Sequence, residues 1–224
     1  MNKLVLFDID RTLLIGDGSG HPRFSKAFKE VYGVDTDINV IDHHGMTDKQ
    51  IIIEVLKKNG LDESIIKSKL ESCADRTVDF FKENIGSQKI ILLDGVEELL
   101  ERLLKDGVFL GLVTGNLEPI ARSKLEKVGI SDYFKVGGFG SDDINRANLV
   151  KIAIKRAEEN FNSKFDVFLV GDTPRDILAG KEAQVRTIGV ATGIHSLEQL
   201  ENSGADFVLE DLKDTNKIMG IILK

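Results

Sequence analysis

Cysteine is almost absent from this chain of 224 residues. Cys73 is the single one, which excludes an intrachain disulfide and a zinc site built from cysteines. Long apolar runs are missing as well: only residues 4–7 precede the first acid, which is too short for the core of a signal peptide. No later run approaches the length of a membrane span. We therefore expect a soluble cytoplasmic protein with no membrane partner.

An excess of basic charge is also missing. The formal net charge is −7 and the pI is near 5.2, whereas a nucleic-acid binder needs a basic surface. The stretch VGGFGSD, residues 136–142, lacks the G-x-G-x-x-G spacing of a nicotinamide-binding fold. Apolar residues make up 42% of the chain, enough for one large domain or for a core domain with a smaller companion. We expect no nucleic-acid partner, and the sequence carries no signal of an oligomeric state.

Short apolar runs recur along the chain and predict strands. Most are continuous rather than alternating, as expected of strands buried on both faces. Helical patterns with apolar residues at three- and four-residue spacing separate them, at 95–105, 118–128 and 148–160. This alternation predicts an α/β fold with a doubly wound, Rossmann-like parallel sheet. The predicted strands are 4–7, 109–113, 136–139, 167–170, 187–190 and 207–209.

The segment after the first predicted strand has a different character. From residue 23 to about residue 85 the pattern is helical and shows no strand. A strand-to-helix connection normally takes only a few residues, so we interpret this long excursion as an inserted helical domain. Its predicted helices are 23–32, 47–59 and 63–84.

The position of the insertion defines the expected domains. We expect a core of residues 1–15 and 88–224, and a small helical cap of residues 16–87. The stretches 16–20, with the sequence GDGSG, and 86–89 would be its two hinges. A cap placed there could close over the residues that follow the first strand.

Two aspartates follow the first apolar run, in the sequence LVLFDID. Asp8 and Asp10 are two residues apart, so on an extended strand both side chains point the same way. Ligands of open α/β sheets bind beyond the carboxyl ends of the strands, where this pair lies. Two charges ~4 Å apart repel by roughly 4 kcal/mol at an effective dielectric near 20, so a shared proton or a cation is needed. The alternative is a pair of turn aspartates that face water.

The fourth predicted strand also runs into acids, in the sequence FLVGDTPRDILAG. Asp172 ends its apolar run as Asp8 does, and Asp176 follows four residues later. Thr173, Pro174 and Asp176 also have the pattern of a helix start, which leaves open whether Asp176 has any further role. Three acids at two strand ends, with no cluster of histidines or cysteines, favour a hard cation. Mg²⁺ takes one or two carboxylates and leaves room for a phosphate.

The second predicted strand ends in the sequence GLVTGNLEPIA. Thr114 lies where a hydroxyl could bond a phosphate oxygen, and Gly115 and Asn116 precede a helix. The N-terminus of a helix favours anions, so these three residues are candidates for phosphate binding. The alternative is a plain turn in which Asn116 caps the helix.

These motifs together resemble those of the haloacid dehalogenase superfamily. The order is a strand into D-x-D-x-T, a strand into a threonine, a basic residue, and then G-D-x-x-x-D. The helical insertion after the first motif is similar to the C1 cap of phosphoglycolate phosphatase-like members. The residues that carry the resemblance are Asp8, Asp10, Thr12, Thr114, Asp172 and Asp176.

The resemblance implies a role for each motif residue. Asp8 would attack phosphorus and form an aspartyl phosphate, and Asp10 would protonate the leaving alcohol and later activate water. Mg²⁺ would be bound by Asp8, by the backbone carbonyl of Asp10 and by Asp172. Thr114 would donate to the phosphate. The implied activity is Mg²⁺-dependent hydrolysis of a small phosphorylated metabolite, as in phosphoglycolate phosphatases.

Two positions depart from the pattern of the superfamily. Arg11 stands where relatives usually have glycine, and we interpret it as a solvated surface group rather than one that reaches toward the cap. The third motif, usually lysine followed by proline, has no clean match. Arg146 and Lys151 are the candidates; we prefer Arg146 as the catalytic cation, because Lys151 falls inside a helix and an Arg fork can stabilise nucleophile and phosphate.

The cap contributes the stretch DHHGMTDKQII, which resembles the G-x-T-D-x-x-I segment of C1-capped phosphatases. That segment tends to face the substrate, so His43, His44 and Thr47 are candidates for substrate contact. The alternative for Thr47 is a capping box with Gln50 at the start of the next helix.

Two other functions remain open from the sequence. A phosphomutase of the β-phosphoglucomutase type would share every motif but return the phosphoryl group to its substrate. A non-catalytic phospho-acceptor such as a receiver domain also gathers acids at strand ends, but such domains are about half this length and lack the insertion.

Overall fold

Six parallel strands form the central sheet of the computed structural model, which describes residues 1–17 and 22–224. They are β1 (Asn2–Phe7), β4 (Phe109–Thr114), β5 (Val136–Phe139), β6 (Phe165–Gly171), β7 (Arg186–Val190) and β8 (Phe207–Leu209). Their spatial order is β5–β4–β1–β6–β7–β8, with β1 at the centre between β4 and β6. The structure confirms the predicted α/β fold with a Rossmann-like parallel sheet.

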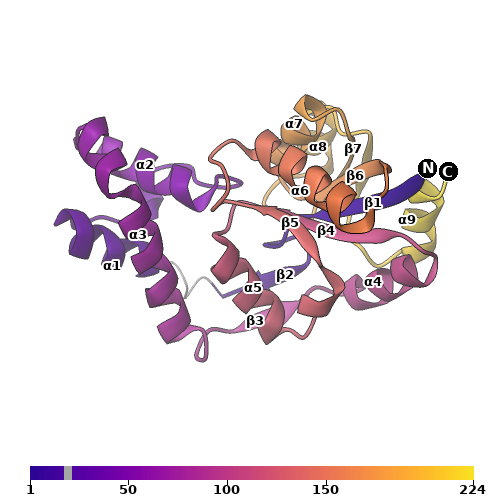
Figure 1. Cartoon of the computed structure of the whole chain (residues 1–224), viewed down its shortest axis with the longest axis horizontal. Helices are drawn as coiled ribbons and strands as arrows, with labels where there is room; N and C mark the ends of the chain where they lie inside the picture. The colour runs from indigo at the N-terminus through magenta and orange to yellow at the C-terminus, as the bar shows by residue number, and fades with distance from the viewer. Residues whose placement is uncertain (18–21) are drawn as a thin grey trace.

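Helices cover both faces of this sheet (Figure 1). Val5 and Phe7 of β1 pack into one apolar cluster and Leu4 and Leu6 into the other, because alternate side chains of a strand point to opposite faces. The first cluster includes residues of α4 (Val96–Lys105), α5 (Glu118–Lys127) and α9 (Thr215–Ile222). The second includes residues of α6 (Arg146–Phe161) and α7 (Pro174–Glu182), and α8 (Leu197–Asn202) packs beside β7 and β8.

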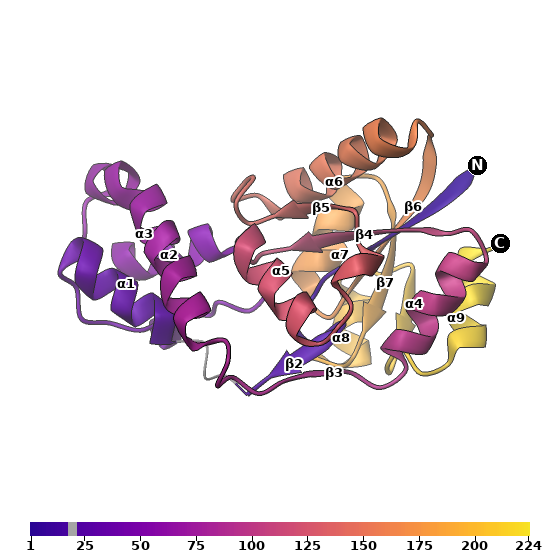
Figure 2. The ribbon, with the colours of Figure 1, turned by 60° about the horizontal axis from the view of Figure 1, so that its bottom comes forward.

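The α-helices between residues 22 and 84 pack on one another, to one side of the sheet (Figures 1 and 2). They are α1 (Pro22–Tyr32), α2 (Asp48–Lys58) and α3 (Glu63–Asn84). Each begins within a residue of its predicted start. The hydroxyl of Thr47 accepts a hydrogen bond from the backbone N–H of Gln50 and caps α2, which is why that helix begins at Asp48.

The segments that lead into and out of these helices form a small antiparallel sheet that the sequence pattern did not predict. β2 (Leu14–Gly16) pairs with β3 (Ile90–Leu92). Beyond them, the backbone N–H of Asp17 donates to the Lys89 carbonyl at 3.1 Å, and the Lys89 N–H donates to the Asp17 carboxylate. The start of the predicted hinge at 16–20 therefore lies beside the end of the one at 86–89, although 18–20 lie outside the described residues.

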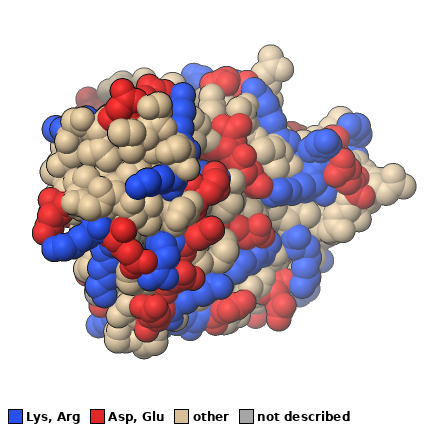
Figure 3. Space-filling view, turned by 60° about the vertical axis from the view of Figure 1, so that its left-hand side comes forward, with Lys and Arg blue, Asp and Glu red and all other residues tan. Residues whose placement is uncertain are grey.

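Two further features of the structure are the distribution of charge on its surface and the length and apolar character of its helices. On the face in Figure 3, lysine and arginine side chains are interspersed with aspartate and glutamate, so the described residues of that face form no continuous basic area. No helix within residues 1–17 and 22–224 combines the length and the apolar character that a membrane span requires.

Candidate active site

A cavity of about 390 Å³ lies beyond the carboxyl ends of β1, β4 and β6. Side chains from these strand ends form one wall, and residues of α1, α2 and the loop before α2 form the other. Parallel strands place their carboxyl ends at one edge of the sheet, which is where open α/β sheets bind ligands. The motif residues Asp8, Asp10, Thr114 and Asp172 all line this cavity.

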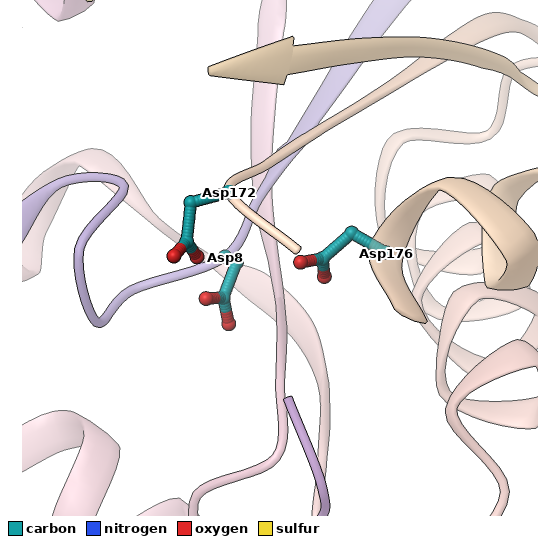
Figure 4. Close-up of side chains that lie close together, drawn as sticks. All are labelled: Asp8, Asp172 and Asp176. Atoms are coloured by element: carbon teal, nitrogen blue, oxygen red, sulfur yellow. The ribbon is translucent and has the colours of Figure 1, made fainter. Parts of the chain in front are cut away.

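Three buried carboxylates converge at the base of the cavity (Figure 4). Asp8 follows β1, Asp172 follows β6 and Asp176 lies in the first turn of α7, and one oxygen from each lies within 4.8 Å of the others. Burial raises the pKa of Asp8 to about 7, although the guanidinium of Arg146 opposes this shift. Burial, with the negative charge of Asp8 and Asp176, raises the pKa of Asp172 to about 8. A further positive charge between Asp8 and Asp172 would stabilise the ionised form of both carboxylates.

The donors at this cluster fit a hard divalent cation. All are carboxylate oxygens, and none is a histidine nitrogen or a cysteine sulfur, which is the donor set of Mg²⁺ rather than of zinc. Glycine at position 193 leaves space for the Asp172 carboxylate, because a Cβ there would lie 1.9 Å from Asp172 Oδ2. The Thr12 hydroxyl donates a hydrogen bond to Asp172 Oδ1 at 3.4 Å. This threonine of the first motif therefore helps to orient the Asp172 carboxylate.

Arg146 supplies a positive charge at the same cluster. It is the first residue of α6, after the N-cap Asn145, and its Nη2 lies 2.8 Å from Asp8 Oδ1 and 2.6 Å from Asp176 Oδ1. Its Nη1 donates to the carbonyl of Gly45, in the loop before α2, at 3.1 Å. The other third-motif candidate, Lys151, is half-exposed and pairs with Glu182. Of these two cations, the structure brings only Arg146 to Asp8.

Asp176 has two functions in the structure. Its carboxylate forms the capping box of α7 with Thr173, and it accepts a hydrogen bond from Arg146 Nε at 2.8 Å. The close packing of this carboxylate against the chain explains Gly171, where a Cβ would lie 2.3 Å from Asp176 Cγ. The helix cap and the positioning of the arginine therefore depend on the same side chain.

Asp10 does not join this carboxylate cluster. Lys124 of α5 donates to both of its carboxylate oxygens, at 2.7 and 2.6 Å, and Asn116 Nδ2 donates at 2.6 Å. Burial alone would raise the pKa of Asp10, but the charge and hydrogen bonds of Lys124 and the amide of Asn116 hold it below its usual range. Asn116 also donates to the Thr114 hydroxyl at 2.9 Å, which links the two motifs.

Lys124 was not predicted from the sequence. It lies on the buried face of α5 together with Ile120, Ala121 and Leu125. The available signal was that this lysine is spaced three and four residues from apolar residues that form the buried face of the helix. A lysine on such a face requires an acidic partner, because lysine is almost never fully buried unless it is paired.

The loop after β4 is in direct contact with the loop before α2. A Cβ on Gly115 would lie 2.3 Å from the Met46 carbonyl oxygen, so only glycine permits this approach. The Asp48 N–H donates to the Gly115 carbonyl at 2.7 Å, and the Leu117 N–H donates to Asp48 Oδ2 at 2.9 Å. Asp48, which was also not predicted, thus joins the inserted helices to the phosphate-binding candidate loop.

Comparisons with known proteins identify the family. The model of the haloacid dehalogenase-like hydrolases matches residues 5–190. The chain belongs to this family of hydrolases. Its relatives include pyrophosphatase PpaX of Oceanobacillus iheyensis, 27% identical over 97% of both chains, and a phosphoglycolate phosphatase of Vibrio parahaemolyticus, 27% identical over 98% of this chain and 96% of that one. A hydrolase from Pseudomonas syringae shares the fold, with a TM-score of 0.73 at 20% identity over 99% of both chains. The resemblance inferred from the motifs is confirmed.

In this haloacid dehalogenase-like hydrolase, the loop before α2 brings two histidines to the cavity. His43 and His44 line it with their rings stacked 4.8 Å apart, and the His44 carbonyl accepts a hydrogen bond from Arg175 at 3.0 Å. Thr47 is fully buried and is not among the lining residues. Its hydroxyl caps α2 and lies 3.4 Å from the Ile144 carbonyl, so the structure does not bring it to the cavity.

Arg11, which we interpreted from the sequence as a solvated surface group, lines the cavity and is partly buried. Its φ is 61°, a left-handed conformation that costs a residue with a side chain roughly 1–2 kcal/mol. The sequence showed that arginine replaces glycine at this position, but not that its side chain lines the cavity. That placement depends on how residues 9–14 fold back on themselves.

Arg23 of α1 is a further cavity residue that the sequence did not indicate. It is buried, its guanidinium lies 3.7 Å from Asp48 Oδ1, and it stacks near the rings of Phe24 and Phe81. Burial raises the pKa of Asp48, and the charge of Arg23 opposes this shift. The pair places a matched positive and negative charge on the cap side of the cavity.

Proposed function

We propose that this hydrolase is a Mg²⁺-dependent phosphatase that cleaves a small phosphate monoester through an aspartyl phosphate on Asp8. The observation that carries the proposal is the position of the Asp8 carboxylate. It is buried at the base of a cavity that fits a small metabolite, 2.8 Å from Arg146 and next to Asp172. The name of one relative, a phosphoglycolate phosphatase, supports this activity, and that of another, a pyrophosphatase, supports hydrolysis at phosphorus.

Each residue then has a defined task in the reaction. A carboxylate oxygen of Asp8 attacks phosphorus and the ester oxygen leaves, taking a proton from Asp10. Arg146 stabilises the negative charge that develops on the phosphoryl oxygens. In the second half, Asp10 accepts a proton from water, the water oxygen bonds to phosphorus, and the acyl phosphate bond to Asp8 breaks to release inorganic phosphate.

The remaining residues of the site bind the substrate and the cation. Asp8 and Asp172, with the backbone carbonyl of Asp10, would hold Mg²⁺, which neutralises charge on the transferring phosphoryl group when bound. Thr114, Gly115 and Asn116 would donate hydrogen bonds to the phosphate, and His44 would contact the rest of the substrate. Thr47 would act indirectly, by fixing the start of α2.

We propose that residues 16–87 are a cap and that residues 1–15 and 88–224 are the catalytic core. The contacts of Gly45 with Arg146 and of Asp48 with Gly115 and Leu117 support this division, because they join the two parts at the site itself. Water would then be excluded when the cap is seated.

Phosphate release tests the proposed function. The protein is incubated with Mg²⁺ and a panel that contains phosphoglycolate, pyrophosphate, sugar phosphates and nucleoside monophosphates, beside the Asp8→Asn variant. We expect turnover by the natural sequence that falls at least ~10³-fold in the variant and that EDTA removes. Equal release by both proteins would overturn the assignment of Asp8. Conversion of a sugar phosphate to its isomer without phosphate release would indicate a mutase.

A further inference from the structure

The backbone of Arg11 is held in its left-handed conformation from both sides. Its N–H donates to the Leu14 carbonyl at 2.7 Å, and its carbonyl accepts a hydrogen bond from the Thr192 hydroxyl. Glycine would adopt the same φ of 61° without strain. Strained residues concentrate at functional sites, where the surrounding structure maintains them. The strain at this position therefore indicates a role for the Arg11 side chain.

The guanidinium of Arg11 differs from the other cations that line the cavity. Arg146 pairs with Asp8 and Asp176, Lys124 with Asp10, and Arg23 with Asp48. Within residues 1–17 and 22–224, no carboxylate pairs with Arg11. Its charge therefore remains available to a ligand, in a cavity where Arg23, Lys124 and Arg146 each have an acidic partner.

Arg11 lines the cavity beside the loop before α2, next to His43 and His44. Burial lowers the pKa of His44, and the charge of Arg11 acts in the same direction. The positive charge on this side of the cavity therefore comes from Arg11, in a chain with a net charge of −7. A positive charge that lines a cavity attracts an anionic group from solution.

We infer that Arg11 determines specificity by binding a second anionic group of the substrate, distinct from the phosphoryl group transferred at Asp8. A guanidinium fork matches the oxygens of a carboxylate or of a phosphate. Arg11 follows Asp8 by three residues in a tightly folded loop, so the two anionic groups would be a few bonds apart. This inference rests on the proposed function of the site and narrows its substrates to small, doubly anionic phosphate esters.

Matched ligands separate this inference from the proposed function. Phosphoglycolate and 2-hydroxyethyl phosphate have the same skeleton, but only the first has a carboxylate. Ethanediol bisphosphate replaces the carboxylate with a second phosphate. Dissociation constants are measured by calorimetry with Mg²⁺ in the Asp8→Asn background, where binding does not require turnover. The same constants are then measured with Arg11→Gly, Arg11→Lys or Gln184→Gly added.

Gln184→Gly is the control for backbone strain. Gln184 also has a positive φ, 58°, but it is exposed and does not line the cavity. Both glycine variants should raise the melting temperature, by about 2–4 °C each, because both relieve a left-handed residue. Gln184→Gly should leave every dissociation constant within about twofold of the background protein.

Arg11→Gly should weaken binding of the doubly anionic ligands about tenfold and leave 2-hydroxyethyl phosphate within about twofold. Arg11→Lys should retain part of the preference, since it keeps the charge but loses the fork. Whichever anionic ester loses more affinity identifies the group that Arg11 binds. Equal weakening of all three ligands, or none, would overturn the inference. Absence of phosphate release from the natural sequence would instead overturn the proposed function, and leaves this comparison of affinities intact.

Discussion

Lys124 places an ammonium group directly against the carboxylate that we assign as the acid and base of the reaction. The lysine side chain is almost fully buried, whereas the Asp10 side chain is 42% exposed toward the cavity. Such a partner favours the ionised carboxylate, which suits the step in which Asp10 accepts a proton from water. The same contact also fixes the rotamer of Asp10, together with Asn116.

Replacement of Lys124 by methionine tests this role. We expect Lys124→Met to lower kcat about 10–100-fold, because Asp10 loses its orientation and its bias toward the ionised form. The pKa of Asp10 should rise. Because kcat/KM reports the half-reaction in which Asp10 donates its proton, the basic limb of the profile of kcat/KM against pH should move up by about one pH unit or more. Steady-state kinetics as a function of pH measures both effects.

Lys151→Met is the matched control, since Lys151 is half-exposed on α6 and pairs with Glu182. It should leave kcat and the pH profile unchanged. A fall in kcat of Lys124→Met with no shift of the basic limb would show that the lysine acts on Asp10 through packing alone.

Three of the candidate residues that the sequence indicated share one property. Asp8, Thr114 and Asp172 directly follow or end continuous apolar strands, and parallel strands bring such ends together. Lys124, Asp48 and Arg23 reach the cavity from helices instead, so their proximity depends on how those helices pack. The residue pattern of a single helix does not show how that helix packs against its neighbours. Its one signal is a charged residue on a face that is otherwise apolar.

Two loops join the inserted helices to the core at the site itself. Residues 43–48 lie against the loop after β4, at Gly115, and against Arg146. Because Arg146 donates to Gly45 and also pairs with Asp8, the position of this loop is coupled to that of Arg146, the residue that we propose as the catalytic cation. Small displacements of catalytic groups have large effects on rate.

Gly115→Ala tests whether this seating is required. The new Cβ would lie 2.3 Å from the Met46 carbonyl oxygen, so the two loops must separate. We expect kcat/KM to fall about 10–100-fold while far-UV circular dichroism stays unchanged. Kinetics with the best substrate of the panel gives the measurement.

Gly220→Ala serves as the comparison variant, because nothing lies within 4 Å of a Cβ at that position in α9. It should be fully active and more stable by about 0.5–1 kcal/mol. Full activity of Gly115→Ala would mean that the contact between the loops is not part of catalysis.

The elements themselves were largely predictable, for physical reasons that also explain the exceptions. The strands of the central sheet are buried on both faces, and helices such as α3 begin at a side-chain cap, here Asp62. β2 and β3 have three residues each and are partly exposed, so they have neither a long apolar run nor a period. Their pairing depends on the positions of both linkers, which no local pattern specifies.

At the scale of the whole molecule, stability and metal binding are linked through the buried carboxylates. The pKa of Asp8 is raised to about 7 and that of Asp172 to about 8, chiefly by burial. Both values lie above the ordinary 3.8, so the folded state binds more protons than the unfolded state between about pH 4 and pH 8. Without a cation, this contribution to stability is present at low pH and is lost as the pH rises through that window.

A divalent cation should reverse this loss, since it binds the ionised carboxylates of the folded state only. We expect the difference in melting temperature between protein with Mg²⁺ and protein with EDTA to be near zero at about pH 5 and to grow to a plateau above about pH 8. Differential scanning fluorimetry across this range measures it, and the subtraction removes the titration of groups remote from the cluster. Asp172→Asn should flatten the curve, because it removes both a ligand and a titrating group. A difference that does not change with pH would place the cation away from Asp8 and Asp172, and would leave their convergence in Figure 4 without its proposed counter-charge.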